Sequence, residues 1–123
     1  MQDFLSRFWI AGAAVAGFSA VAMAAVSAHA GLDPVALVLL RSAVEMAMWH
    51  ALALFGVGLW ARSGGGVTVH WAGGFFLSGI LLFCGAVGSL ALFGMRFPGI
   101  APSGGILLMA GWIALLIAAL RAR

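Results

Sequence analysis

Three ionisable side chains in or beside long apolar runs are the residues of this chain best placed to carry chemistry. His50 lies well inside the apolar run 43–61, Glu45 lies near the start of that run, and His29 ends the preceding one. A side chain that can hold a proton or a metal is costly in hydrocarbon unless it faces other protein. His50 is therefore predicted to point into the interior of a helix bundle.

The two histidines invite a haem or metal interpretation, because imidazoles from neighbouring helices are common ligands in membrane bundles. Axial imidazoles must approach within about 4 Å, whereas His50 is expected roughly 10 Å below the start of its span and His29 at the end of the first span. No cysteine or carboxylate cluster completes a site. We therefore predict no metal and no cofactor, and interpret His50 as a hydrogen-bonded interhelical residue and His29 as an interfacial one.

Glu45 and His50 are also the natural members of a proton path, since ionisable residues inside membranes are often functional. Five residues separate them, which corresponds to about 140° around a helix. They cannot line one narrow channel of a monomer, although an oligomer or a partner protein could connect them. Transport of a proton or small solute is kept as an alternative.

The composition defines the elements that must position these residues. Apolar residues make up 65% of the 123 positions and charged residues 7%, too little polar surface for a water-soluble globule. At about 20 residues for each span, the length allows roughly four spans. We predict an all-α, integral membrane four-helix bundle in the lipid bilayer of the cell inner (plasma) membrane, with one domain over residues 1–123 and spans at 8–28, 43–61, 70–93 and 103–120.

The segments between the spans carry recognisable boundary signals. The first apolar run is longer than the hydrophobic core of a secretory signal, so it is interpreted as a span. Gly31 suits a helix end, and Asp33 followed by Pro34 is typical of a helix start. Because the next run is too long for one span, residues 34–42 are predicted to form a separate turn or interfacial helix. Glycine-rich residues 63–66 and the segment 94–101 are predicted loops.

Small residues at helical spacing indicate faces where helices approach closely in lipid. On the second span, His50 shares its face with small residues and lies opposite the bulky face that carries Glu45. The predicted close-packing stripes are Gly12, Ala16, Ala20 and Ala24, then Gly74, Ser78, Gly85 and Ser89, and finally Ala110, Ala114 and Ala118.

The arginines predict the orientation of the chain. All six basic residues are Arg; Arg7, Arg62, Arg121 and Arg123 fall on one side of the predicted bundle, and Arg96 and Arg41 on the other. The positive-inside rule then places both termini in the cytoplasm, and Trp9, Trp60 and Trp71 form an aromatic belt at that boundary. Because these charges are scattered, nucleic acid is not an expected partner.

Other motifs have a plainer structural interpretation. Pro102, Ser103, Gly104 and Gly105 place free backbone amides at a helix start near Arg96, which could hold a carboxylate or a lipid phosphate, but a close helix crossing is favoured. Trp112 is interpreted as core filling, and Cys84 as a small buried hydrophobe. The sequence contains no nucleophile in motif context, phosphate loop or zinc motif, so no enzyme activity is predicted.

Four short blocks are distinctive together: residues 28–32 (AHAGL), 49–54 (WHALAL), 79–85 (GILLFCG), and 102–105 (PSGG) followed by Gly111 and Trp112. In this order they resemble the YgdD-like domain-of-unknown-function family 423. The resemblance implies a four-span membrane protein without an established molecular function. Here Ala30 separates His29 from glycine, Ala47 replaces a common Gln, Cys84 and Gly88 replace Ser and Tyr, and Ala101 replaces Thr, which disfavours a polar relay around His50.

We therefore predict a non-catalytic accessory or assembly protein that packs against itself or a larger membrane complex, with a channel or carrier that uses His50 as the alternative. The chain has more small-residue stripes than four helices need to pack against one another. This surplus favours the first interpretation. The candidate functional or packing residues are His29, Glu45, Trp49, His50, Pro102, Gly104, Gly105 and Trp112.

Overall fold

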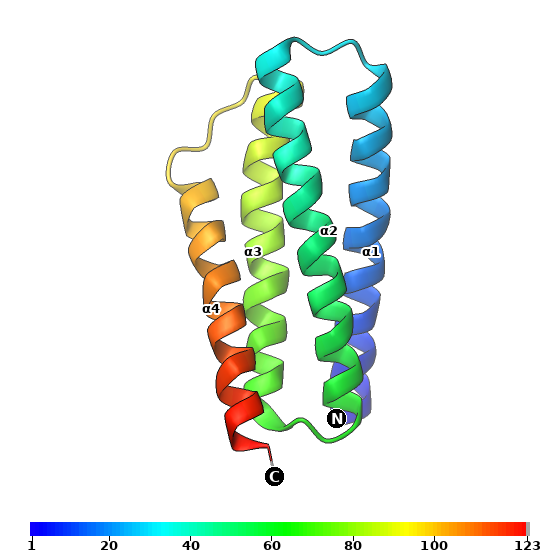
Figure 1. Cartoon of the computed structure of the whole chain (residues 1–123), viewed down its shortest axis with the longest axis vertical. Coiled ribbons are helices and arrows are strands. Elements are labelled where there is room, and N and C mark those ends of the chain that lie inside the picture. Colours follow the sequence, from blue (N-terminus) through cyan, green and yellow to red (C-terminus); the bar gives the residue numbers. More distant parts are fainter. Residues whose placement is uncertain (123) are drawn as a thin grey trace.

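The computed structural model describes residues 1–122 and consists of four long helices that run alternately up and down (Figure 1). These are α1 (Gln2–His29), α2 (Pro34–Arg62), α3 (Gly66–Phe93) and α4 (Ile100–Arg121). Each helix is long and apolar enough to cross a membrane. The predicted all-helical, four-span architecture is confirmed, and the start of α1 and the end of α4 lie at the same end of the molecule.

Helix α2 is one uninterrupted helix of 29 residues, so the prediction of a separate turn or interfacial helix at 34–42 is wrong. The Asp33 side chain accepts hydrogen bonds from the amides of Val35 and Ala36 at 3.0 and 3.1 Å, and Pro34 occupies the first turn, where its missing N–H costs nothing. This capped start carries the helix directly into the span. At about 1.5 Å per residue, the helix is longer than the ~30 Å hydrocarbon layer is thick. The extra length either projects beyond the layer or is accommodated by tilt.

The other three helices also begin before the predicted spans, at Gln2, Gly66 and Ile100. The loop before α4 is accordingly shorter than predicted. Gly99, with φ +78°, caps α4, and Pro102 falls within the first turn, where proline is tolerated. The predicted spans lie inside the observed helices, and the portion of each helix that the hydrocarbon covers stays a prediction.

The helices pack in sequence order, with α1 along α2, α2 along α3 and α3 along α4, while α1 meets α3 more sparsely. Helices α2 and α3 therefore form the centre, and α1 and α4 are the outer members (Figure 1). The core between them is rich in alanine and includes the fully buried side chains of Leu54, Phe76 and Leu108.

Glycines set the close approach of α4 to α3. A Cβ at Gly104 would abut the Phe83 backbone and lie 2.9 Å from its Cα, and a Cβ at Gly79 would lie 2.6 Å from the Leu108 side chain. Similarly, a Cβ at Gly111 would lie 2.6 Å from the ring of Phe76. Lipid supplies no hydrophobic drive for helix association, so close van der Waals packing of this kind holds the pair together.

The predicted small-residue stripe of α3 does not face a neighbouring helix of this chain. Ser78 and Gly85 are exposed, and nothing lies within 4 Å of a Cβ built at Gly74 or Gly85. The α3 glycines at close crossings are instead Gly73 and Gly79. Two sets of small residues share α3, and helical spacing alone does not say which set faces the bundle.

The stripes of the outer helices are better predicted. Ala16 and Ala20 of α1 are buried, and so are Ala114 and Ala118 of α4. On each helix these residues lie one turn apart, so a small-residue ridge faces the bundle.

Replacing Gly104 by alanine tests the α3–α4 crossing. We expect Gly104→Ala to destabilise the folded protein by about 1–3 kcal/mol, because the methyl group must displace the Phe83 backbone. The control is Gly105→Ala at the next position, where a Cβ meets nothing within 4 Å. Thermal unfolding in detergent, followed by circular dichroism, should show a lower midpoint for Gly104→Ala alone. Equal midpoints for the two variants would contradict this account of the crossing.

Candidate functional site

His50 lies in the middle of α2 and is 7% exposed. Its face of the helix also buries Ala43, Ala47 and Val57, so the predicted inward direction is confirmed. The imidazole lies beside Phe76 of α3 and Trp112 of α4, with ring centroids 5.6 and 6.0 Å away. Side chains from three helices therefore meet at this ring.

Hydrogen bonds define the chemical form of His50. The indole Nε1–H of Trp112 donates to His50 Nε2 at 3.1 Å, and His50 Nδ1 lies 2.7 Å from the backbone oxygen of Met46. Because an indole N–H is only a donor, Nε2 must accept, so the proton of the neutral imidazole resides on Nδ1 and is donated to Met46. Both ring nitrogens are satisfied, and the predicted interhelical hydrogen bond is confirmed.

Trp112 differs from its predicted role as core filling, because it is 51% exposed. One edge of its indole reaches into the bundle toward His50, and the rest faces outward. Its ring also meets Phe76 edge to face, with centroids 5.2 Å apart. Tryptophan suits such a place because it combines a large apolar body with one N–H that needs an acceptor.

This arrangement limits what His50 can do. The Nε2 lone pair, which a metal or an incoming proton would use, already accepts the Trp112 N–H. A proton added to Nε2 would face that N–H directly, so a relay through His50 requires the Trp112 indole to move away. Four of the surface hollows formed by residues 1–122 lie between the helices and loops, and His50 lines none of these four. In the described residues, no three His, Cys, Asp or Glu side chains gather as a metal site.

A second tryptophan–histidine pair, which was not predicted, joins α1 to α3. The indole of Trp9 donates to His70 Nδ1 at 3.0 Å. Trp9 is 8% exposed and lies against Gly73, where a Cβ would approach its ring to 2.7 Å. Trp9 is therefore a packing residue inside the bundle, which corrects its predicted place in an aromatic belt. The two partners lie on different helices, so no spacing signal connects them.

The remaining side-chain candidates, Glu45, His29 and Trp49, are exposed and do not share the buried site of His50. His29 is exposed at the last residue of α1, whereas His50 lies about 24 Å along α2 from Pro34. The structure does not bring the two histidines together. Glu45 and Trp49 are exposed on the outer face of α2, as the helical wheel predicts for Glu45.

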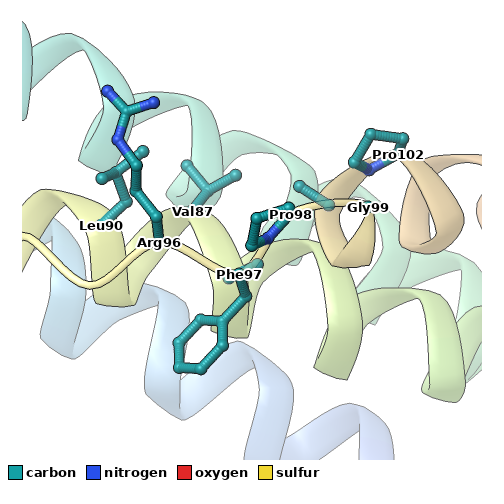
Figure 2. A pocket seen from close by; sticks show the side chains of 9 residues that line it. Val87, Leu90, Arg96, Phe97, Pro98, Gly99 and Pro102 are labelled. Carbon is teal, nitrogen blue, oxygen red and sulfur yellow. The ribbon is translucent and has the colours of Figure 1, made fainter.

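The start of α4 forms the predicted close crossing through Gly104. Gly105 contacts nothing within 4 Å of a built Cβ, and the Ser103 hydroxyl donates to the Gly99 carbonyl at 2.6 Å. Beside it lies a hollow of about 270 Å³ whose lining includes Arg96 and Pro102. Figure 2 shows the Arg96 and Phe97 side chains pointing to opposite sides of the loop. Binding of an anion there stays a prediction.

Cys84 is buried, and its thiol lies 3.4 Å from the Ala43 carbonyl. Its predicted role as a small buried hydrophobe is confirmed, with an added weak hydrogen bond between α3 and α2.

Comparison with known proteins agrees with a membrane protein. The family model described as "Protein of unknown function (DUF423)" matches residues 8–105, most of the chain. The chain belongs to the DUF423 family. Within this family, it is 31% identical over 120 residues to the UPF0382 inner membrane protein YgdD of Escherichia coli (strain K12), covering 94% of this chain and 92% of the relative.

A second DUF423 relative comes from a different bacterium. The UPF0382 membrane protein SERP0230 of Staphylococcus epidermidis is 38% identical over 82 residues, 66% of each chain. No solved structure matches the chain. This DUF423 member is thus a multi-pass protein of the cell inner membrane, of a family whose molecular function is not established.

Removing the Trp112 donor tests the His50 site. We expect Trp112→Phe to lower the free energy of unfolding by about 1–3 kcal/mol, because His50 Nε2 is then left without a partner in a water-poor interior. The control is Trp71→Phe, since Trp71 is 62% exposed. Chemical unfolding in detergent measures both. If Trp112→Phe costs no more than the control, the hydrogen bond does not stabilise the bundle.

The two tryptophan–histidine pairs predict opposite tautomers. His50 should carry its proton on Nδ1, because Trp112 donates to Nε2. His70 in its neutral form should carry the proton on Nε2, because Trp9 donates to Nδ1. Nitrogen-15 NMR of histidine-labelled protein at mildly alkaline pH distinguishes the tautomers, with His50→Gln and His70→Gln for assignment. The same tautomer at both residues would contradict the geometry.

Proposed function

We propose that this DUF423 protein is a small, non-catalytic accessory or assembly subunit of the inner membrane, which packs against a second copy of itself or a larger membrane complex. The observation that carries the proposal is a set of helical glycines without close neighbours. Apart from chain neighbours and the backbone of the same helix turn, no atom of residues 1–122 lies within 4 Å of a Cβ built at Gly17, Gly56, Gly74, Gly85 or Gly105.

Glycine destabilises a helix, but in lipid it allows another helix to approach closely. Gly79 and Gly104 make such an approach inside the chain, whereas Gly74 and Gly85 do not. Both of these lie on α3, and Gly85 is exposed. A helix of another protein chain that packs on these faces would use the same close van der Waals contact that holds α4 to α3.

The second candidate function is a channel or carrier for protons or a small solute through His50. A buried histidine in a spanning helix favours it, since such residues often mark ion pathways. The occupied ring nitrogens count against it, and so does the lining of the groove of about 510 Å³ between α1 and α3, which consists almost entirely of apolar side chains.

We propose further that both termini face the cytoplasm. Arg7, Arg62 and Arg121 belong to the end of the bundle that holds the start of α1 and the end of α4. Arg96, in the α3–α4 loop, and Arg41, in the first half of α2, belong to the other end. The excess of arginine favours the cytoplasmic side for the first end. The predicted contribution of Arg123 lies outside the described residues.

The proposal is tested by gentle detergent extraction, affinity purification and native mass spectrometry. We expect a species of defined stoichiometry that contains this chain with a second copy or with another membrane protein. A lone monomer that carries protons into vesicles, with flux abolished by His50→Ala and unchanged by His29→Ala, would instead establish the transport function. His29 is the matched control because it is an exposed histidine at the end of α1.

A further inference from the structure

Contacts across three helices place Glu45 inside the portion of the bundle that is predicted to lie in hydrocarbon. The Cys84 thiol bonds the Ala43 carbonyl, and Gly104 abuts Phe83, so these residues share one level across α2, α3 and α4. Helix α4 has 22 residues, about 33 Å, little more than the ~30 Å hydrocarbon layer. Gly104 therefore lies about 6 Å below the start of α4, and Glu45 about 3 Å deeper.

At this depth, charged side chains almost always face the protein interior or pair with one another. Glu45 does neither within the bundle core, because it is exposed on the outer face of α2. Its side-chain carbons help to line a groove of about 420 Å³ between α1 and α2, whose exposed lining is apolar. This carboxylate needs hydrogen-bond donors on the outer side of the helix.

Two donors flank Glu45 on the same face, each one helical turn away. Arg41 precedes it by four residues and Trp49 follows it by four, and both are exposed. Arg41 of the same chain is poorly placed as a sole partner, because a basic residue before an acidic one at this spacing is the weaker order on a helix.

The surrounding surface has the repeat of a helix–helix seam. Apolar and charged side chains recur at alternating spacings of three and four residues, as in left-handed helix pairs. We call this surface the α2 outer face: Val38, Arg41, Glu45, Met48, Leu52, Phe55 and Leu59. Apart from the half-buried Met48, all its members are exposed.

We propose that the α2 outer face is the interface of a parallel, two-fold symmetric homodimer, in which Glu45 of each chain accepts hydrogen bonds from the partner's Arg41 and the partner's Trp49. This inference rests on the proposed function and names its partner as a second copy of the chain. The groove beside Glu45 would receive the partner's Trp49.

Charge complementarity favours a second copy over another protein. In a parallel two-fold pair, the same residues meet at the same level, so each Glu45 lies within one turn of the partner's donors. A surface on which an acceptor has a donor on each side can therefore pair with a second copy of the same surface. The two carboxylates and two guanidinium groups then neutralise one another away from lipid.

Disulfide cross-linking in native membranes tests the interface. In a Cys84→Ala background, Leu52→Cys should form a covalent dimer on mild oxidation, because a disulfide requires Cβ atoms about 3.5–4.5 Å apart. The matched control is Leu81→Cys on α3, since Leu52 and Leu81 are 58% and 65% exposed. Adding Glu45→Gln to Leu52→Cys should weaken dimerisation by about tenfold.

Complementary charge variants separate pairing between chains from pairing within a chain. Glu45→Arg alone and Arg41→Glu alone each put like charges on both sides of the interface, so neither should self-associate. Co-expressed with different tags, the two variants should co-purify, because one chain then presents two basic groups and the other two acidic groups. A salt bridge confined to one helix cannot produce this result.

The inference is overturned if Leu52→Cys cross-links no better than Leu81→Cys, or if the two charge variants fail to associate. A stoichiometric complex with a different protein and no homodimer would refute the inference while the proposed function stands. A monomer with His50-dependent proton flux would refute both.

Discussion

An imidazole surrounded by hydrocarbon must have both of its ring nitrogens satisfied by protein, and the arrangement of the helices depends on how His50 meets this requirement. One nitrogen bonds the Met46 carbonyl of its own helix, and the other accepts the Trp112 N–H from α4. Helices α2 and α4 each pack along α3. The Trp112–His50 hydrogen bond therefore ties α4 to α2 across Phe76 and restricts how α4 can rotate or slide.

Close packing at glycine brings the indole within reach of the imidazole. Gly79, Gly104 and Gly111 let α4 lie against α3, and Gly111 faces Phe76, the ring that also contacts His50. A bulkier residue at any of these glycines would push α4 outward and lengthen the distance from Trp112 to His50. Packing and hydrogen bonding are thus coupled at one place. This coupling suits a protein in lipid, where hydrophobic burial contributes little to helix association.

The two ionisable residues within the second predicted span are placed differently. His50 is enclosed and its hydrogen bonds are complete, so the interior needs nothing further from a ligand or water. Glu45 lies on the outer face of α2 with donors one turn away on either side. The ionisable group of this DUF423 protein that still needs hydrogen-bond partners is therefore on the surface, which supports a role in assembly.

The sequence by itself determined the class of protein, the four spans, the Asp33 cap and the inward direction of His50, because apolar length, capping chemistry and helical periodicity are properties of one segment at a time. Only the tertiary structure decided that Trp112 and Trp9 donate to His50 and His70, that Gly79 rather than Gly85 faces a neighbour, and that residues 34–42 continue α2. The physical reason is that partners on separate helices are set by the rotation and register of whole helices against one another. Spacing within a single helix does not specify these quantities.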